Sequence, residues 1–356
     1  MAPGGISTGL WPVCKAAGWR RLRRCAPVLG VAIGAALAQQ NTPGRATTTE
    51  ASALRHEQLR GVVSGRVFSN VNRNDARPAL KVWFDVVARQ RGYILDSTVD
   101  IVDSAAEIRK RLQSHSVELA IIGISEFLEL ESSNLIVPVL TDARTSQGGA
   151  LYSYVLLVNP SSGVTSIASL RGRNVLVSAR GSGETGMAWL EVLLSKEKLG
   201  RAASFFASIK VADKPQACIL PVFFGKVDAC VVDEVNLDLA KEMNPQLGQL
   251  RVLARSRPMI ESVIAVPAEP HPCQEELIDR MLKLPADPSG RQLLMVFKTE
   301  RLVRLQPGDL DSARELWRDY YRLPGSTPSS PVGSASAAQD NRVDRRQEEV
   351  AGKERH

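Results

Sequence analysis

The chain has 356 residues and a formal net charge of +7, and 44% of its residues are hydrophobic, 23% charged and 5% aromatic. The basic residues do not alternate with the few aromatic residues, which argues against a nucleic-acid-binding protein. Between the two ends of the chain lie about 270 residues, enough for two modest lobes.

The first 38 residues have the pattern of an export signal. Arginines between Arg20 and Arg24 precede a short apolar run over residues 26–35, and the small residues at 36 and 38 predict cleavage after Ala38. The apolar run is too short for a good membrane span. We therefore expect a protein exported to the periplasm, with a soluble N-terminal helix as the alternative.

Strands and helices are predicted to alternate in the first half of the chain. A strand over residues 60–68 leads through a polar loop to a helix whose apolar residues recur at helical spacing over 80–87. A strand over 98–102 follows. Ser104 and Glu107 then form a capping box that begins a helix, and a buried strand covers 117–123.

The same order recurs in the second half, where a glycine-rich turn over residues 181–186 separates a strand from a helix. Such alternation predicts two α/β lobes with parallel sheets covered on both faces. The expected elements are strands over residues 174–178, 208–211 and 227–232 and helices over 187–199 and 215–225.

The predicted ligand site lies where the carboxyl ends of parallel strands meet the following helices. The backbone N–H groups of the turn over residues 181–186 would be unpaired at a helix start and favour an anion. If the lobes face each other, these turns surround one cleft. The other turns contribute Asn72, Asn74, Ser104, Ser125 and Glu234.

Several segments, in this order, resemble the periplasmic substrate-binding proteins of phosphate/phosphite/phosphonate ABC transporters. The resemblance spans residues 59–316 and implies the α/β type II periplasmic binding protein fold, with two lobes and parallel-rich sheets joined by two crossover strands. It also implies capture of a small ligand by a monomer, without catalysis, and an ABC permease with its ATPase as partner. The matching segments are residues 117–123, 152–158, 167–175, 183–186 and 225–229.

The resemblance also implies a domain organisation. Residues 57–153 would form the first part of lobe I, residues 154–256 lobe II, and residues 257–323 the return to lobe I. A linker over 39–56 would precede the lobes. The segment 324–356 is rich in small residues and then in charges, which predicts a disordered, solvated tail.

The family's site residues transfer to this chain only in part. Its anion-binding turn corresponds to the run Gly183, Glu184, Thr185 and Gly186, and Tyr152 corresponds to a tyrosine that closes over the ligand. Ser104 stands where an aromatic contact is expected, and Pro215 stands where a histidine is expected. Acidic residues that hold an amino group in some members correspond to Glu261 and to the neighbour of Glu234.

Glu184 is the largest departure, because it places a carboxylate where the family has a hydroxyl. Facing the cleft, it would repel a phosphonate. Turned outward, it would be a first-turn acid favoured by the helix dipole, and this outward orientation is the preferred prediction. The expected ligand is a phosphate- or phosphonate-like oxyanion, with a zwitterion as the alternative, or a cation if Glu184, Glu234 and Glu261 all face inward.

Other functional classes have less support. The histidines form no nucleophile–base motif, and Cys218, Cys230 and Cys273 match no zinc pattern, so no catalytic residue, metal or cofactor is expected. Cys218, in the helix predicted over 215–225, and Cys230, in the strand predicted over 227–232, are expected to be buried apolar residues. A sensory module is the alternative function, because type II binding folds also report ligands to separate receptors.

Overall fold

The computed structural model describes residues 55–67, 78, 80–81, 93–144, 149–179, 183–270 and 274–326. The predicted export signal, the linker up to residue 54, the loop with Asn72 and Asn74, and the segment after residue 326 lie outside the described residues. Cys273 and most of the helix predicted over residues 80–87 also lie outside them.

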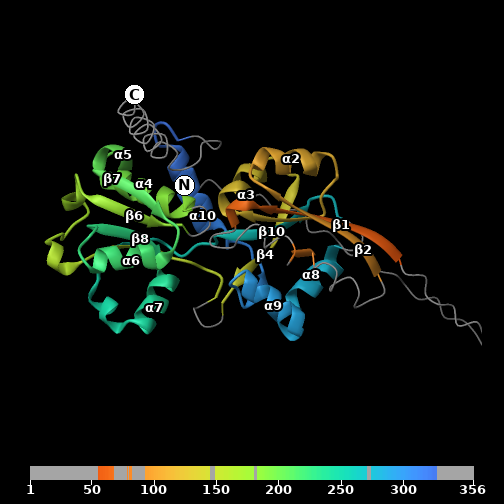
Figure 1. Cartoon of the computed structure of the whole chain (residues 1–356). Helices are drawn as coiled ribbons and strands as arrows, with labels where there is room; N and C mark the ends of the chain where they lie inside the picture. Colours follow the sequence, from red (N-terminus) through yellow and green to blue (C-terminus); the bar gives the residue numbers. More distant parts are fainter. Residues whose placement is uncertain are drawn as a thin grey trace, which may run out of the picture. The chain divides into compact units, whose positions relative to one another are not determined.

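The first sheet has the strand order β11-β4-β10-β3-β1-β2 (Figure 1). Strand β1 pairs in parallel with β2 and β3, whereas β10 pairs antiparallel with β3 and β4, and β11 pairs antiparallel with β4. Its strands are β1 (Arg55–Ser64), β2 (Tyr93–Val102), β3 (Leu119–Gly123), β4 (Ile136–Ala143), β10 (Ser262–Pro267) and β11 (Arg301–Arg304).

The second sheet has the order β7-β6-β8-β5-β9. Strand β6 pairs in parallel with β7 and β8, and β5 pairs antiparallel with β8 and β9. Its strands are β5 (Tyr154–Val158), β6 (Asn174–Ser178), β7 (Ser208–Ala212), β8 (Ala229–Asp233) and β9 (Arg251–Arg255).

The helices connect the strands and cover the sheets. Most predicted elements are present, with shifted ends. Helix α4 begins earlier than expected, at Glu184, because Gly183 adopts a left-handed conformation and serves as its N-cap. The α-helices are α2 (Ala105–Gln113), α3 (Ile124–Glu131), α4 (Glu184–Lys196), α5 (Ala202–Phe205), α6 (Pro215–Phe223), α7 (Glu234–Met243), α8 (Gln274–Leu282), α9 (Pro288–Val296) and α10 (Asp311–Tyr321).

Two chain segments cross between the sheets, one from β4 to β5 and one from β9 to β10. They touch where Tyr152 and Met259 pair as an isolated bridge. The predicted α/β fold with two sheets joined by two crossovers is confirmed. Parallel pairing is confined to three strands of each sheet, because β10 and β5, the strands that follow the two crossovers, run opposite to their neighbours β3 and β8.

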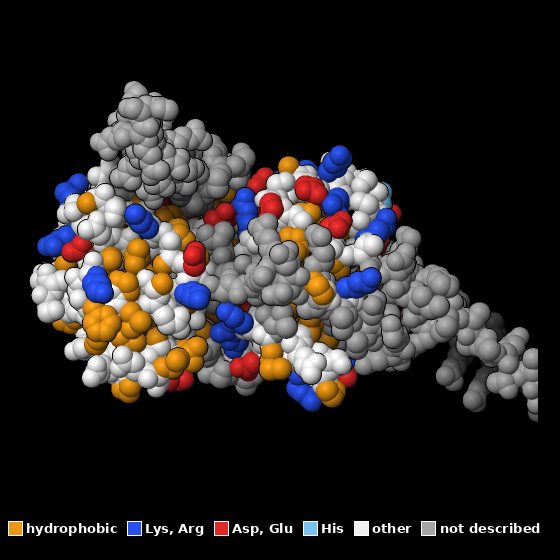
Figure 2. Space-filling view, viewed as in Figure 1, with side chains coloured by type: hydrophobic (Ala, Val, Ile, Leu, Met, Phe, Trp, Pro, Cys, Tyr) orange, Lys and Arg blue, Asp and Glu red, His pale blue; other side chains and the backbone are white. Residues whose placement is uncertain are grey.

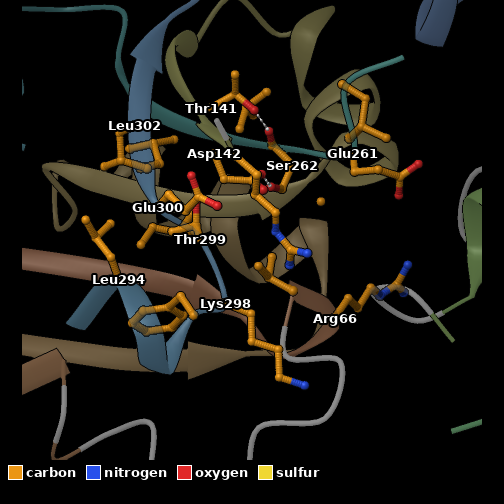
Figure 3. A pocket seen from close by; sticks show the side chains of 18 of the residues that line it. Arg66, Thr141, Asp142, Glu261, Ser262, Leu294, Lys298, Thr299, Glu300 and Leu302 are labelled. Atoms are coloured by element: carbon orange, nitrogen blue, oxygen red, sulfur yellow. Dashed lines mark hydrogen bonds between the residues drawn. The ribbon is translucent and has the colours of Figure 1, made fainter. Parts of the chain in front are cut away.

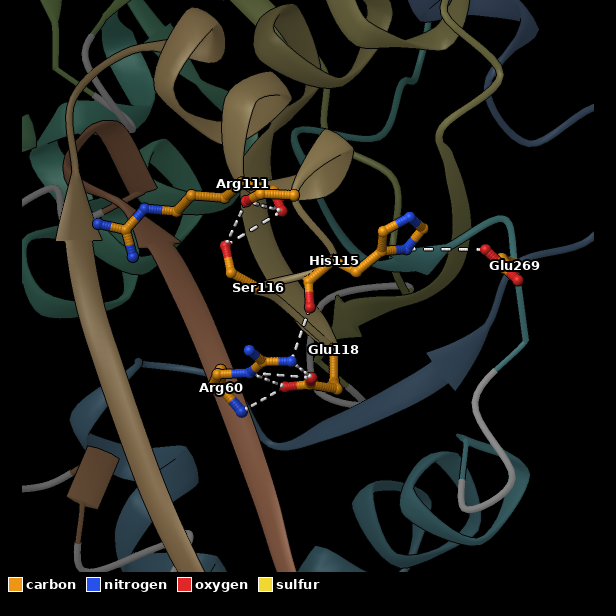
Figure 4. Close-up of polar contacts among 7 residues, drawn as sticks. Arg60, Arg111, His115, Ser116, Glu118 and Glu269 are labelled. Atoms are coloured by element: carbon orange, nitrogen blue, oxygen red, sulfur yellow. Dashed lines mark hydrogen bonds and ion pairs between the residues drawn. The ribbon is translucent and has the colours of Figure 1, made fainter.

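One acid in each half holds the amino end of a parallel strand pair. Glu118 accepts hydrogen bonds from the Arg60 backbone and guanidinium, which joins β3 to β1 (Figure 4). Asp228 does the same before β8, accepting from the Asn174 backbone at 2.9 Å and from Arg173 at 3.0 Å. These acids lie at the strand ends remote from the predicted cleft, so their role is structural.

Helix α10 packs against both α3 and α4 (Figure 1). One hydrophobic cluster includes residues of both sheets together with Ala313, Leu316, Trp317 and Tyr320 of α10. Ion pairs continue this contact, since Arg314 binds Glu131 of α3 and Asp319 binds Lys196 of α4. Helix α10 therefore joins the helices that begin on either side of the predicted cleft.

Candidate functional site

A cavity of about 640 Å³ lies beside the carboxyl ends of β1, β3, β6 and β8 (Figure 3). Both halves of the fold line it. Its polar lining is mostly from the first half, with Arg66, Ser125, Thr141, Asp142, Arg144, Glu261, Ser262, Lys298, Thr299 and Glu300; the second half adds Glu184, Thr185, Gln216 and Asn236.

Local turns place the main charged groups at this cavity. Strand β1 ends at Ser64, and the 3₁₀ turn Gly65–Val67 directs Arg66 beyond the strand, with its backbone N–H on the Ser64 Oγ at 3.1 Å. Helix α4 begins after Gly183, whose φ of 76° favours glycine, and a Cβ added there would lie only 3.2 Å from the Val211 side chain. The expectation that residues 60–68 form one strand is wrong, because the 3₁₀ turn interrupts it.

Glu184 faces the cavity, so the preferred prediction of an outward orientation is wrong. Its Oε1 lies 2.8 Å from the Arg66 Nη1, and the Ser125 hydroxyl donates to its Oε2 at 3.0 Å. Only 7% of the residue is exposed. The helix dipole stabilises a first-turn carboxylate whether its side chain points outward or into the cavity. The hydrogen bonds from Arg66 and Ser125 favour the inward orientation of Glu184.

Arg66 lies between two carboxylates. Its Nε is 3.6 Å from Oε1 of Glu126, a residue that is 1% exposed. The other Glu126 oxygen accepts from the backbone N–H of Gly123 at 3.2 Å. Burial raises the pKa of Glu126, and the charge of Glu184 raises it further, while Ser64, Arg66 and Gly123 lower it. Arg66 is thus the counter-charge for both acids.

Replacing Glu126 with glutamine should change how stability depends on pH. The pKa of Glu126 is raised above its ordinary 4.5, so the folded protein binds this proton more tightly than the unfolded chain. The resulting stabilisation of the folded state is complete below the ordinary pKa of 4.5. It is lost as the pH rises through the pKa that Glu126 has in the folded protein. Relative to wild type, the glutamine variant should therefore gain stability on going from mild acid to neutral pH.

Thermal unfolding of both proteins across this pH range measures the effect. A matched control is Glu107→Gln, because Glu107 is an exposed glutamate paired with Arg111. If the difference in thermal stability between the Glu126 variant and wild type does not change with pH, the pKa of Glu126 is not raised in the folded protein.

Asp142 forms another charged part of the wall. The Tyr152 hydroxyl donates to its Oδ2 at 2.5 Å, and the Ser262 hydroxyl donates to its Oδ1 at 2.9 Å. The Thr141 hydroxyl donates to the Ser262 carbonyl (Figure 3). Tyr152 is only 1% exposed and is absent from the cavity lining among the described residues. It therefore orients Asp142, and the expected closure of its ring over a ligand has no support in this geometry.

The predicted site residues divide into two groups. Ser125, Glu184, Thr185 and Glu261 meet at the cavity, and the Glu261 carbonyl accepts from the first N–H of α3. The others have local structural roles in the described part of the chain: Ser104 caps α2, Gly183 caps α4, and Glu234 pairs with Arg255. A Cβ added to Gly186 would lie only 3.0 Å from the Tyr154 ring, so this position favours glycine for close packing.

Sequence reasoning missed Arg66, Asp142, Arg144 and Lys298. None belongs to a motif, and Arg66 was hidden inside an apparent strand. The one available signal was its position after the apolar pair Val62 and Val63, separated from it by Ser64 and Gly65, where a strand end faces the cleft. Within the described ranges, no cluster of metal-ligating side chains occurs, and no helix is both long and apolar enough to cross a membrane.

The sequence model of the family described as "ABC transporter, phosphonate, periplasmic substrate-binding protein" matches residues 67–310. No curated protein matches the chain.

Similar solved structures come from several bacteria. XAC2383 from Xanthomonas citri, bound to ATP, is 17% identical over 74% of this chain and 97% of its own, with a TM-score of 0.54. A binding protein component of an ABC phosphonate transporter from Pseudomonas aeruginosa is 14% identical over 84% of this chain and 99% of its own, with a TM-score of 0.52. PhnD1 from Prochlorococcus marinus, in complex with methylphosphonate, is 14% identical over 75% of this chain and 99% of its own, with a TM-score of 0.51. At these identities the likeness establishes the fold alone.

Proposed function

The chain belongs to the family of periplasmic substrate-binding proteins of phosphonate ABC transporters, and on that premise we propose that it captures a small solute with an oxyanion group in the cavity beside Arg66. The family binds solutes for transport and is not a family of enzymes. The captured solute would be delivered to a membrane permease and its ATPase. Residues 1–38 would serve as the export signal.

The observation that carries this proposal is the meeting of two helix N-termini at one cavity. Ser125 lies in the first turn of α3, Thr185 lies in the first turn of α4, and Arg66 lies between these helices in the lining. N-terminal N–H groups, hydroxyls and a guanidinium are the groups that hold oxyanions in proteins. PhnD1, which has a similar fold, was solved with methylphosphonate.

The cavity also holds carboxylates that a simple oxyanion would not use. Asp142, Glu184 and Glu261 line it together with the cations Arg66 and Arg144. Opposite charges around one space suit a solute with an anionic and a cationic end. A zwitterion with a phosphonate and an amino group is therefore our second solute class.

Delivery requires an outer surface that a permease can contact. Hydrophobic side chains gather over α6 and α7 on the face in Figure 2. Phe224 and Met243, which follow α6 and end α7, are 64% and 75% exposed. Exposed apolar patches of this kind often mark protein contacts, which supports docking through this part of the second half.

A thermal-unfolding screen tests the capture. The compounds are phosphate, phosphite, methylphosphonate, 2-aminoethylphosphonate, sulfonates and carboxylates. A true ligand at about a hundredfold excess over its Kd should add roughly 2.7 kcal/mol to the free energy of unfolding. No stabilisation by any compound would overturn the proposal. Uptake of the stabilising solute should then require this chain, whereas a sensing role predicts unchanged uptake.

A further inference from the structure

Glu184 occupies the place where the two halves of the fold would hold an anion. Its carboxylate accepts a hydrogen bond from the Arg66 guanidinium at 2.8 Å and another from the Ser125 hydroxyl at 3.0 Å. Glu184 itself opens α4, and Ser125 lies in the first turn of α3. Helix N-termini, a hydroxyl and a guanidinium are an anion's usual partners, and here the anion is part of the protein.

A second glutamate shows that this contact does not follow from helix position alone. Glu234 opens α7 as Glu184 opens α4, and it too pairs with an arginine. That arginine, Arg255, ends β9 of the same sheet, and neither residue lines the cavity. Glu184 instead contacts groups that follow β1 and β3 of the first sheet, and its side chain is only 9% exposed.

We propose that Glu184 is an internal anion that occupies the oxyanion position of the cavity, competes with simple oxyanions for that position and holds the two halves together without a solute. The inference rests on the proposed function because it concerns the same cavity. A solute oxyanion must displace the carboxylate from Arg66 and Ser125. The displaced carboxylate, still attached to α4, then repels the oxyanion and weakens binding.

The side chain at position 184 therefore determines which solutes bind. Serine there would keep a hydroxyl at the start of α4 and remove the charge. Glutamine would keep the size of the side chain and its capacity to accept from Ser125. Both changes remove one of the two carboxylate partners of Arg66, so an added anion can take the place of Glu184 while Glu126 remains.

The test compares wild type with Glu184→Ser, Glu184→Gln and the control Glu234→Gln. Calorimetric titration with inorganic phosphate and with methylphosphonate measures affinity, and X-ray scattering without added solute measures the radius of gyration. We expect both Glu184 variants to bind one or both anions at least about tenfold more tightly than wild type. We also expect a larger radius of gyration than wild type, which decreases when the anion is added. Glu234→Gln should match wild type in both measurements.

Two results would overturn the inference: anion affinities within twofold of wild type in both Glu184 variants, or the same gain in Glu234→Gln. Near-ultraviolet circular dichroism identifies a variant that is not folded. If one Glu184 variant is not folded, the anion affinity of the other Glu184 variant decides the test. The proposed function fails separately. If wild type binds no screened solute while Glu184→Ser binds phosphate, the internal anion stands and the capture role does not.

Discussion

Replacing Arg66 with methionine should lower the free energy of unfolding by about 3 kcal/mol, the lower end of the cost of breaking a buried ion pair. Arg66 is the counter-ion of Glu184 at 2.8 Å and of Glu126 at 3.6 Å, and both acids are almost fully buried. Methionine has a similar length and no charge, so two carboxylates would be left close together without it. The melting temperature should fall by roughly 10 °C.

Two comparisons isolate the charge effect. Arg255→Met removes an arginine from the exposed pair with Glu234 and should cost less than about 1 kcal/mol. Arg66→Met combined with Glu184→Gln should recover part of the loss, because one of the unpaired charges is gone. Chemical denaturation measures all three variants. A stability of Arg66→Met equal to that of Arg255→Met would show that Arg66 has no role as counter-ion.

Replacing Trp317 with alanine should destabilise the protein by about 3–5 kcal/mol, as for other large buried aromatic residues. Trp317 is 2% exposed, and its ring centroid lies 5.5 Å from that of Tyr320 and 5.6 Å from that of Tyr321. Its helix, α10, packs on both α3 and α4. The cavity left behind would loosen the contact between these two helices, so ligand affinity should fall together with stability.

Arg318→Ala provides the control, because Arg318 is exposed on the same helix. Trp317→Phe should cost less than alanine, since the ring packing is mostly kept. The lost indole N–H also has no hydrogen-bond partner within the described part of the chain. Thermal unfolding followed by circular dichroism compares the three variants. An alanine variant as stable as Arg318→Ala would show that α10 does not support the fold.

The sequence allowed most strands of the fold to be predicted, because buried parallel strands are short apolar runs. The predicted strand over residues 174–178 matches β6, and that over 208–211 differs from β7 by one residue. The start of α4 was placed too late, since Gly183 begins the helix through its backbone conformation, which leaves no mark in hydrophobic periodicity. The antiparallel strands β10 and β11 depend on the return crossover, and local pattern does not reveal which strands they join.

The site was less predictable than the fold. Ser125 and Thr185 followed from the rule that strand ends and helix starts meet at the cleft. The direction of Glu184 did not, because it depends on Arg66, which lies 118 residues away in the sequence. Tyr152 was expected at the ligand for its ring, whereas its hydroxyl binds Asp142. Contacts between distant segments decided each of these cases.

The contact between Glu184 and Arg66 also raises the solute concentration at which the cavity fills. A carboxylate attached to the same chain cannot diffuse away, so it competes for Arg66 as an intramolecular partner. A free oxyanion has to compete with that carboxylate before it can take the place of Glu184 at Arg66. The cavity would thus fill when the solute is abundant and remain closed on its own side chain when the solute is scarce.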